Sequence, residues 1–269
     1  MASLHFAYGF YLYCLGFFGS TETRNVASAY NEPKIHIGAV QSLTDIVTEK
    51  LQLAIINGDF ALGEKISEEA LSLKLGVSRT PIRDALARLQ TVGLVTVKPK
   101  RGSFVFKPNN QDVVDICDFR FMVELQAAKR SFYKNPIKLI KSLSYIAQKM
   151  HIAMDSNNTS EYSNLDTSYH QTFFEYCDNK YLNNAFNLVN SRIAALRLSI
   201  TSPQSELRTI SFREHLSMVN HLKENKISEF EETLHEHIMR TQNVYLKALA
   251  IQSSNKKPTL KGVTLQEKK

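Results

Sequence analysis

The stretch GVSRTPIRDALARLQTVGLV, residues 76–95, predicts an amphipathic helix that begins just after a turn. Its apolar residues recur at the i, i+3, i+4 and i+7 spacing of one helix face: Ile82, Ala85, Leu86 and Leu89. If Ser78 caps this helix, Pro81 falls in the first turn, where main-chain N–H groups have no partner inside the helix. The proline therefore fixes where the helix begins without removing a hydrogen bond.

The face opposite these apolar residues is polar and basic. Thr80 and Arg83 point away from the apolar face, and Arg79 projects from the N-terminal end beside Ser78. Arginine can bond O6 and N7 of guanine together, Ser and Thr can bond phosphate, and a helix N-terminus attracts phosphate. We therefore predict that these four residues contact DNA. The alternative is an ordinary surface helix, but arginines four residues apart repel each other slightly and would not stabilise it.

Two further helices are predicted before this one. Residues 41–58 open with Ser42 and, three residues later, Asp45, which together resemble a capping box. Residues 67–76 form a short helix that Gly76 ends. Three short helices in this order are typical of a helix-turn-helix domain.

A β-hairpin is predicted directly after the third helix. Residues 94–107 alternate between apolar and polar side chains on both sides of a central break. Lys100 and Arg101 lie at the tip, and Gly102 permits the turn, so the tip suits the minor groove or the DNA backbone. Together with the three helices, this hairpin predicts a winged helix-turn-helix domain over residues 41–107.

The positive charge of the chain is concentrated in two segments. The formal net charge is +7; residues 76–107 contribute +6 and residues 256–269 contribute +4, so the rest of the chain is slightly negative. A local basic patch is typical of proteins that bind an anionic polymer. Charge alone would fit a solvated surface equally well.

The region after the hairpin predicts a second, helical domain. Beyond a polar linker the pattern is helical, with no strand signal. We expect an antiparallel all-α bundle over residues 112–252, with these helices: 112–133, 136–155, 159–177, 180–201, 204–224 and 226–251. The fold class is therefore mainly α.

Both ends of the chain are expected to be disordered. Residues 1–40 form an irregular extension whose apolar run is too short to span a bilayer, so no membrane partner is expected; a membrane-associating segment is the alternative. Residues 253–269 form a basic tail. The cysteines show no CxxC pair and no disulfide framework, which fits a cytoplasmic protein: Cys14, Cys117 and Cys177.

Three histidines and one aspartate of the helical domain are expected to face its interior. Asp166 and His170 lie one turn apart on one apolar stripe. His215 lies with Leu216 on the apolar stripe of a later helix, and His237 lies on that of the last helix. Imidazole and carboxylate groups suit Zn²⁺, Ni²⁺, Mn²⁺ or Fe²⁺. We therefore predict a divalent metal site. The alternative is that each group is a hydrogen-bonded core residue.

The segment LGVSRTPIRDALARLQTVGLV…KPKRGSFV resembles the N-terminal domain of the GntR family of bacterial transcription regulators. The resemblance covers about residues 41–107. It implies that Arg79, Thr80 and Arg83 contact DNA from the recognition helix and that Gly102 does so from the wing. One position departs from the pattern, because several relatives carry an arginine where this chain has Glu69.

Residues 112–250 resemble the FCD effector domain of the FadR subfamily, through DFRFMVELQAA, DTSYHQTFFEYCDNKYL and EHLSMVNHLKENKISEFEETLHEHI. The resemblance implies one metal ion bound by four residues: Asp166, His170, His215 and His237. Open coordination positions would accept water or the carboxylate of a small organic-acid effector. Arg120 is a further candidate for holding that acid, and a salt bridge to Glu124 is its alternative role.

These features predict a ligand-responsive transcription regulator, not an enzyme. A homodimer would place two recognition helices in successive major grooves of a palindromic operator on double-stranded DNA, and the effector would favour one conformation of the dimer. A metal-dependent hydrolase would need an HExxH motif or another inward glutamate beside the site, and we expect neither. A metal-free effector pocket in the same regulator is the remaining alternative.

Overall fold

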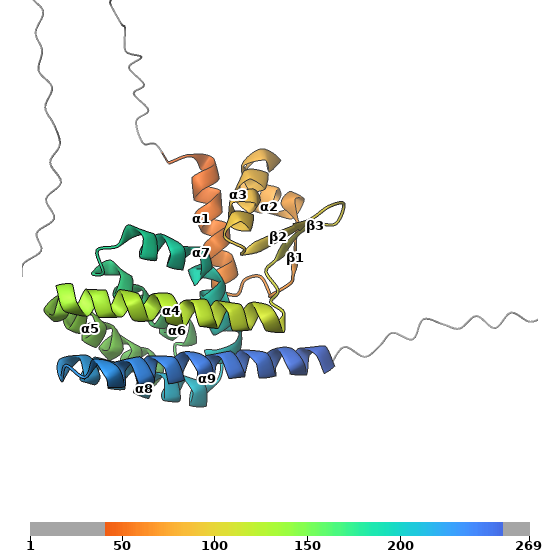
Figure 1. The fold of residues 1–269 in the computed structure, drawn as a ribbon. Helices are drawn as coiled ribbons and strands as arrows, with labels where there is room; N and C mark the ends of the chain where they lie inside the picture. The colour runs from red at the N-terminus through yellow and green to blue at the C-terminus, as the bar shows by residue number, and fades with distance from the viewer. Residues whose placement is uncertain (1–40, 255–269) are drawn as a thin grey trace, which may run out of the picture. The chain divides into compact units, whose positions relative to one another are not determined.

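The computed structural model describes residues 41–254 (Figure 1). The predicted extension over residues 1–40, Cys14 and residues 255–269 of the predicted tail lie outside the described residues. Across residues 41–254, the helices are too short or too polar for any of them to cross a membrane. The described elements are mainly helical, as predicted.

The first part of the described chain contains three helices and a small antiparallel sheet. In chain order the elements are α1 (Leu43–Ile56), β1 (Lys65–Ile66), α2 (Glu68–Leu75), α3 (Arg79–Thr91), β2 (Val95–Lys98) and β3 (Gly102–Val105). The strand order is β1-β3-β2, so β1 adds a third strand to the predicted hairpin. Sequence reasoning missed β1 because two residues are too few to show an alternating pattern.

Local side-chain signals set the ends of these helices. Ser42 and Asp45 form the predicted capping box, with Asp45 N–H donating to Ser42 Oγ at 3.1 Å and Ser42 N–H donating to the Asp45 carboxylate at 2.9 Å. Gly76 ends α2 with a φ of 66°, which favours glycine. Ser78 precedes α3 in an extended conformation, but its hydroxyl makes no capping hydrogen bond to the helix.

The predicted apolar face of α3 forms the core of the winged helix-turn-helix. Its four predicted residues are almost completely buried: Ile82, Ala85, Leu86 and Leu89. They pack with apolar residues of α1, including Leu51 and Ile55. The α3 helix thus packs through its apolar face, and its polar face is exposed.

The second part of the described chain consists of helices packed into a bundle (Figure 1). They are α4 (Asn110–Lys134), α5 (Pro136–Asp155), α6 (Thr159–Glu175), α7 (Lys180–Leu196), η1 (Arg197–Thr201), α8 (Ser205–Lys223) and α9 (Ile227–Ser254). The predicted helix over residues 180–201 is in fact α7 followed by η1, a π-helical turn. Apolar periodicity cannot distinguish such a turn from a continuing α-helix, and π-turns often occur at functional sites.

Two features of this bundle matter for the site. Asn157, between α5 and α6, has a φ of 49°, a left-handed conformation that asparagine tolerates better than most residues. On α7, Ser191 and Ala195 contact the winged helix-turn-helix: Gln52 Nε2 donates to Ser191 Oγ at 2.8 Å, and Ala195 packs in the same apolar cluster as Leu51. The last turns of α7 therefore lie against α1.

Candidate nucleic-acid interface and candidate metal centre

The predicted DNA-contacting residues lie together at one end of α3. Ser78, Arg79, Thr80 and Arg83 are all exposed, whereas Pro81 and the apolar face are buried. The first turn of α3 also presents main-chain N–H groups that have no acceptor within the helix. The arrangement can receive phosphate and base edges at the same time.

Two glutamates of α2 pair with the arginines of this face. Arg83 Nε lies 2.7 Å from Glu68 Oε2, and Arg79 Nη2 lies 3.4 Å from Glu69 Oε1. Glu69 is the position at which the sequence departs from the family pattern, and in the structure its carboxylate pairs with Arg79. Ion pairs this exposed contribute about 0–1 kcal/mol, so phosphate can replace the glutamates at little cost.

The predicted tip of the β-hairpin is a tight, exposed turn. Lys100 has a φ of 60° and Gly102 has a φ of 95°, and Arg101 N–H donates to the Lys98 carbonyl at 3.0 Å. Lys100, Arg101 and Gly102 are all exposed. The turn therefore presents two cations and a glycine without a side chain to obstruct a nucleic acid.

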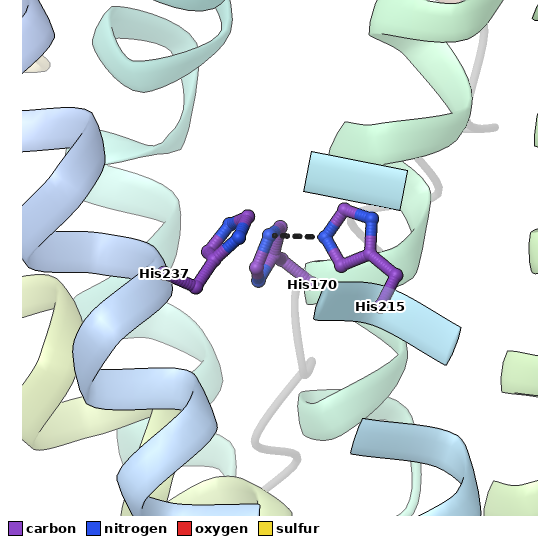
Figure 2. A group of neighbouring side chains, drawn as sticks. All are labelled: His170, His215 and His237. Atoms are coloured by element: carbon purple, nitrogen blue, oxygen red, sulfur yellow. Dashed lines mark hydrogen bonds between the residues drawn. The ribbon is translucent and has the colours of Figure 1, made fainter. Parts of the chain in front are cut away.

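Three of the four predicted metal ligands meet in the interior of the helical bundle. His170 comes from α6, His215 from α8 and His237 from α9, and each is at most 2% exposed. One ligand atom of each lies within 4.8 Å of the others. Figure 2 shows the His170 ring between the other two, with His170 Nε2 3.3 Å from His215 Nε2.

Two glutamates, the buried Glu124 and the half-buried Glu214, orient two of these rings. Glu124 Oε2 lies 2.7 Å from His170 Nδ1, and Glu214 Oε2 lies 2.7 Å from His237 Nδ1. When Nδ1 carries the proton and donates it to the carboxylate, Nε2 keeps its lone pair for another partner. Carboxylate–histidine pairs of this kind are typical of metal sites.

Burial keeps the three imidazoles neutral. It lowers the pKa of His215 to about 3, and it lowers the pKa of His170 well below its ordinary value. Burial also lowers the pKa of His237, although the neighbouring Glu214 opposes the shift. Neutral imidazole is the form that binds a metal ion.

Asp166, the fourth predicted ligand, lies beside the histidines but already has a cationic partner. Its Oδ1 is 2.5 Å from Arg197 Nε and 3.7 Å from His170 Nε2, and Ser211 Oγ donates to its Oδ2 at 3.3 Å. Burial alone would raise the pKa of Asp166, but the Arg197 charge holds it well below its ordinary range. Asp166 is therefore an ionised carboxylate shared between a guanidinium and the histidine cluster.

A polar pocket lies next to this cluster and is rich in arginine. Four arginines line it, together with Asp166 and His237: Arg120, Arg197, Arg208 and Arg240. Arg120 forms the salt bridge considered as its alternative role, with Nε 2.5 Å from Glu124 Oε1. Arg120 and Tyr245 both line the pocket and are about 2% exposed, and neither Arg120 Nη2 nor the Tyr245 hydroxyl has a hydrogen-bond partner. Both proposed roles of Arg120 are thus compatible with the structure.

Sequence reasoning was wrong about two features of the site. It expected no unassigned inward glutamate, yet Glu214, with its side chain 19% exposed, contacts His237. Glu124, expected only as a partner of Arg120, is fully buried and also contacts His170. Each side chain is held by an arginine of its own helix or a neighbouring one, Arg120 or Arg240, so neither is a free general base. It also placed Leu216 on the inward stripe of α8, whereas Leu216 is 40% exposed.

Other contacts around the site had no recognisable sequence signal. Arg197 belongs to the π-turn, whose register the apolar pattern does not predict. Arg208 lies near the start of α8, where a charged residue is expected to be exposed. Glu124 was expected as a partner of Arg120, one turn earlier on α4, but not as a partner of His170.

Known protein families match both the winged helix-turn-helix and the helical bundle. Residues 43–105 match the model of "Bacterial regulatory proteins, gntR family", and residues 115–240 match that of the "FCD domain". The chain is 26% identical over 209 residues to the gluconate operon transcriptional repressor of Bacillus subtilis (strain 168), which spans 77% of this chain and 78% of that protein.

Two further similarities extend the comparison. The chain is 30% identical over 122 residues to an uncharacterized HTH-type transcriptional regulator of Agrobacterium vitis, covering 44% of this chain and 71% of that protein. A crystal structure of a GntR transcriptional regulator from Rhodococcus sp. RHA1 has the same fold, with a TM-score of 0.68 at 18% identity over 76% of this chain and 98% of that one.

Fold, exposed basic helix and relatives together define a DNA-binding transcription regulator and not an enzyme. The chain belongs to the GntR family, and its helical part is an FCD domain.

Proposed function

We propose that this regulator binds a palindromic operator as a homodimer in the cytoplasm and that its FCD domain binds a divalent metal ion and a small carboxylate effector. One observation carries the proposal: three buried, neutral histidines from three helices present ring nitrogens within 4.8 Å of one another. The operator contacts would come from Ser78, Arg79, Thr80 and Arg83 on α3, and from the tip of the wing.

The donor set fits a divalent ion. Two nitrogens that are each about 2.1 Å from a tetrahedral ion lie about 3.4 Å apart, close to the 3.3 Å between His170 Nε2 and His215 Nε2. His237 supplies a third nitrogen, and Asp166 supplies an oxygen. Three imidazoles and one carboxylate suit Zn²⁺, Ni²⁺, Mn²⁺ or Fe²⁺.

The bound ion would supply positive charge and an open position for an acidic effector. Arg120 would orient that acid, because it lines the same pocket and its Nη2 has no hydrogen-bond partner. A guanidinium is well suited to a carboxylate, since its N–H groups match the two oxygens. The repressor of a gluconate operon among the relatives supports an organic acid as the class of effector.

The connection from pocket to DNA would run through α7 and η1. Arg197 holds Asp166, and only two residues earlier Ala195 packs in the core of the winged helix-turn-helix. A metal ion or effector that binds Asp166 would break its ion pair with Arg197. Arg197 would then move to another partner, and the shift of α7 would reach α1 through Ala195. The effector would then alter operator binding to the extent that it favours one arrangement.

Elemental analysis of the purified protein tests the metal site. We expect about one divalent ion per chain in the wild type and a loss of that ion in His215→Ala and Asp166→Ala. His235→Ala is the matched control, because His235 lies on α9 two residues from His237 but is exposed. Equal metal content in wild type and His215→Ala would contradict the proposal.

A metal-free effector pocket is the second candidate, and one contact favours it. Arg197 already neutralises Asp166, so the aspartate does not need an ion as a partner. If the protein carries no stoichiometric metal but still binds small acids in a thermal-shift screen, this candidate replaces the first.

A salt titration of operator binding tests the wing. Lys100→Ala should weaken binding across all DNA sequences and reduce the slope of log affinity against log salt by about one, because one phosphate contact is lost. An unchanged slope would remove Lys100 from the interface.

A further inference from the structure

We propose that Arg208 and Ser202 form a second anion-binding subsite, so that the effector is a small acid with two anionic groups, the second a carboxylate or a phosphate. This inference rests on the proposed effector function and adds a ligand class to it. It assigns the two anionic groups to different residues of the pocket: one to Arg120 beside His237, the other to Arg208 and Ser202.

The pairing of the four pocket arginines singles out Arg208. Three of them each lie within 4.0 Å of a carboxylate: Arg120 of Glu124, Arg197 of Asp166, and Arg240 of Glu214. Arg208 is the exception in the described part of the chain, since its guanidinium meets only neutral acceptors. Nη1 donates to the Ser202 carbonyl, and Nη2 donates to Asn157 Oδ1 at 3.0 Å.

Arg208 is also buried, with 8% of its surface exposed. A buried charge without an opposite charge is costly, and proteins normally pair it. Since no side chain of the described residues supplies the negative charge, a ligand in the pocket that Arg208 lines is the natural source.

Ser202 gives an independent indication of a polar ligand at the same place. Ser202 lines the pocket, and its side-chain hydroxyl is buried without a hydrogen-bond partner. The Ser202 carbonyl accepts from Arg208, so the unused hydroxyl lies on the residue that contacts the guanidinium. A guanidinium and a hydroxyl together provide the donors that a carboxylate or a phosphate accepts.

The charge of the pocket agrees with a dianion. Four arginines face three carboxylates, so with neutral histidines the group carries one excess positive charge. A divalent ion raises this excess to three. A monoanion leaves two of these charges uncompensated in a buried site, whereas a dianion leaves one.

The spacing along α8 sets the span of the ligand. Arg208 precedes His215 by seven residues, which places their Cα atoms about 10 Å apart along the helix axis on the same face. Of these residues, Arg208 and Ser211 line the pocket. The cavity is small, about 20 Å³, which is room for roughly one water-sized group, so lining side chains have to move to admit even a compact acid.

Calorimetric titration of the metal-loaded full chain tests the subsite with matched pairs of acids. The pairs are propionate with malonate, butyrate with succinate, pentanoate with glutarate, and glycolate with 2-phosphoglycolate; the last separates phosphate from carboxylate. We expect at least one dianion to bind about tenfold or more tightly than its monoanionic partner. In Arg208→Gln this preference should disappear, while monoanion affinity and metal content stay unchanged.

Control variants separate a ligand contact from a structural one. Arg213→Gln, on an exposed position of the same helix, should keep the preference. Ser202→Ala should reduce the preference for the dianion but not abolish it. If Arg208→Gln does not fold, Arg208→Lys keeps the charge but not the fork of donors and should bind the dianion more weakly than wild type.

The outcomes distinguish this inference from the proposed function. If wild type binds both members of every pair equally, or if Arg208→Gln keeps the preference, Arg208 only caps the end of η1 and the subsite is refuted, while the proposed metal and effector site stands. If metal is bound but no acid of either class binds, the effector part of the proposed function fails and the subsite fails with it.

Discussion

The arginines of the DNA-binding part form exposed ion pairs, whereas those of the FCD domain form buried ones. Arg79 and Arg83 of α3 pair with glutamates across an exposed surface, with the arginine side chains 54% and 63% exposed. Arg197 pairs with Asp166 at about 5% exposure. An exposed pair is worth little and its partner can be exchanged for DNA phosphate, whereas a buried pair cannot lose one member without leaving a charge uncompensated.

This difference separates two kinds of task. If the surface arginines contact DNA as proposed, they would exchange one anion for another in each binding event, and weak pairing would suit that role. If the FCD pocket binds the proposed effector, its buried arginines would hold the site in one geometry until the ligand enters. Variants of the two sets of ion pairs test this difference, and the buried pair should show the largest effect.

Removing the buried guanidinium should have the largest effect. Arg197→Ala should lower the free energy of unfolding by about 3–5 kcal/mol, because Asp166 is left buried and unpaired. Urea unfolding measures this loss, with the exposed Arg213→Ala as control, which should change it by less than about 0.5 kcal/mol. The double variant Arg197→Ala/Asp166→Ala should lose less than Arg197→Ala alone; an equal or larger loss would show that the pair is not the cause.

Removing an exposed guanidinium should instead affect only DNA binding. Arg83→Ala should weaken operator binding by about 1–3 kcal/mol if Arg83 reads a base, as measured by fluorescence anisotropy. Its unfolding free energy should stay within about 0.5 kcal/mol of wild type, since its ion pair with Glu68 is exposed. Unchanged operator affinity would remove Arg83 from the recognition face.

Releasing an arginine from its glutamate should strengthen DNA binding slightly. Glu69→Ala frees Arg79 and removes a negative charge beside the phosphates, so affinity should rise by up to about 1 kcal/mol at low salt and by less at high salt. The exposed Glu232→Ala, in α9, is the control for a general change in charge. Weaker binding by Glu69→Ala would mean that Glu69 itself contacts the operator.

The smallest effect concerns a carboxylate of the DNA-binding part. The side-chain hydrogen bond from Arg88, followed by those from Ser42, lowers the pKa of Asp45 from 3.8 to about 2. Because the folded-state pKa is depressed, the stability from this group is present above about pH 4 and is lost as the pH falls toward 2. Between these pH values, the free energy of unfolding should decrease less with falling pH for Asp45→Asn than for wild type, as measured by urea unfolding at each pH.

The DNA-binding part was the more predictable of the two. Its helix ends depend on local signals, such as the Ser42–Asp45 capping box and the left-handed Gly76, which are visible in a few consecutive residues. The buried face of α3 follows directly from its apolar spacing. Only β1 was missed, because its pairing with β3 depends on residues far apart in the chain.

In the FCD domain, the sequence predicted which histidines face inward but not the charged residues around them. His170, His215 and His237 face inward because each continues an apolar stripe. Their partners were missed because an ion pair between different helices leaves no periodic signal: Arg197 reaches Asp166 across 31 positions, and Glu124 reaches His170 across 46. The sequence therefore predicts where a site lies better than it predicts which charges in it remain unpaired.

The left-handed turn at Asn157 links folding stability to ligand recognition. A glycine would adopt its φ of 49° without strain, so Asn157→Gly should be neutral or slightly stabilising for the backbone. The same change removes the amide oxygen that holds Arg208. Arg208 would then be a buried cation with one acceptor fewer, at a cost of about 1–3 kcal/mol, so relief of backbone strain does not by itself make Asn157→Gly a stabilising change.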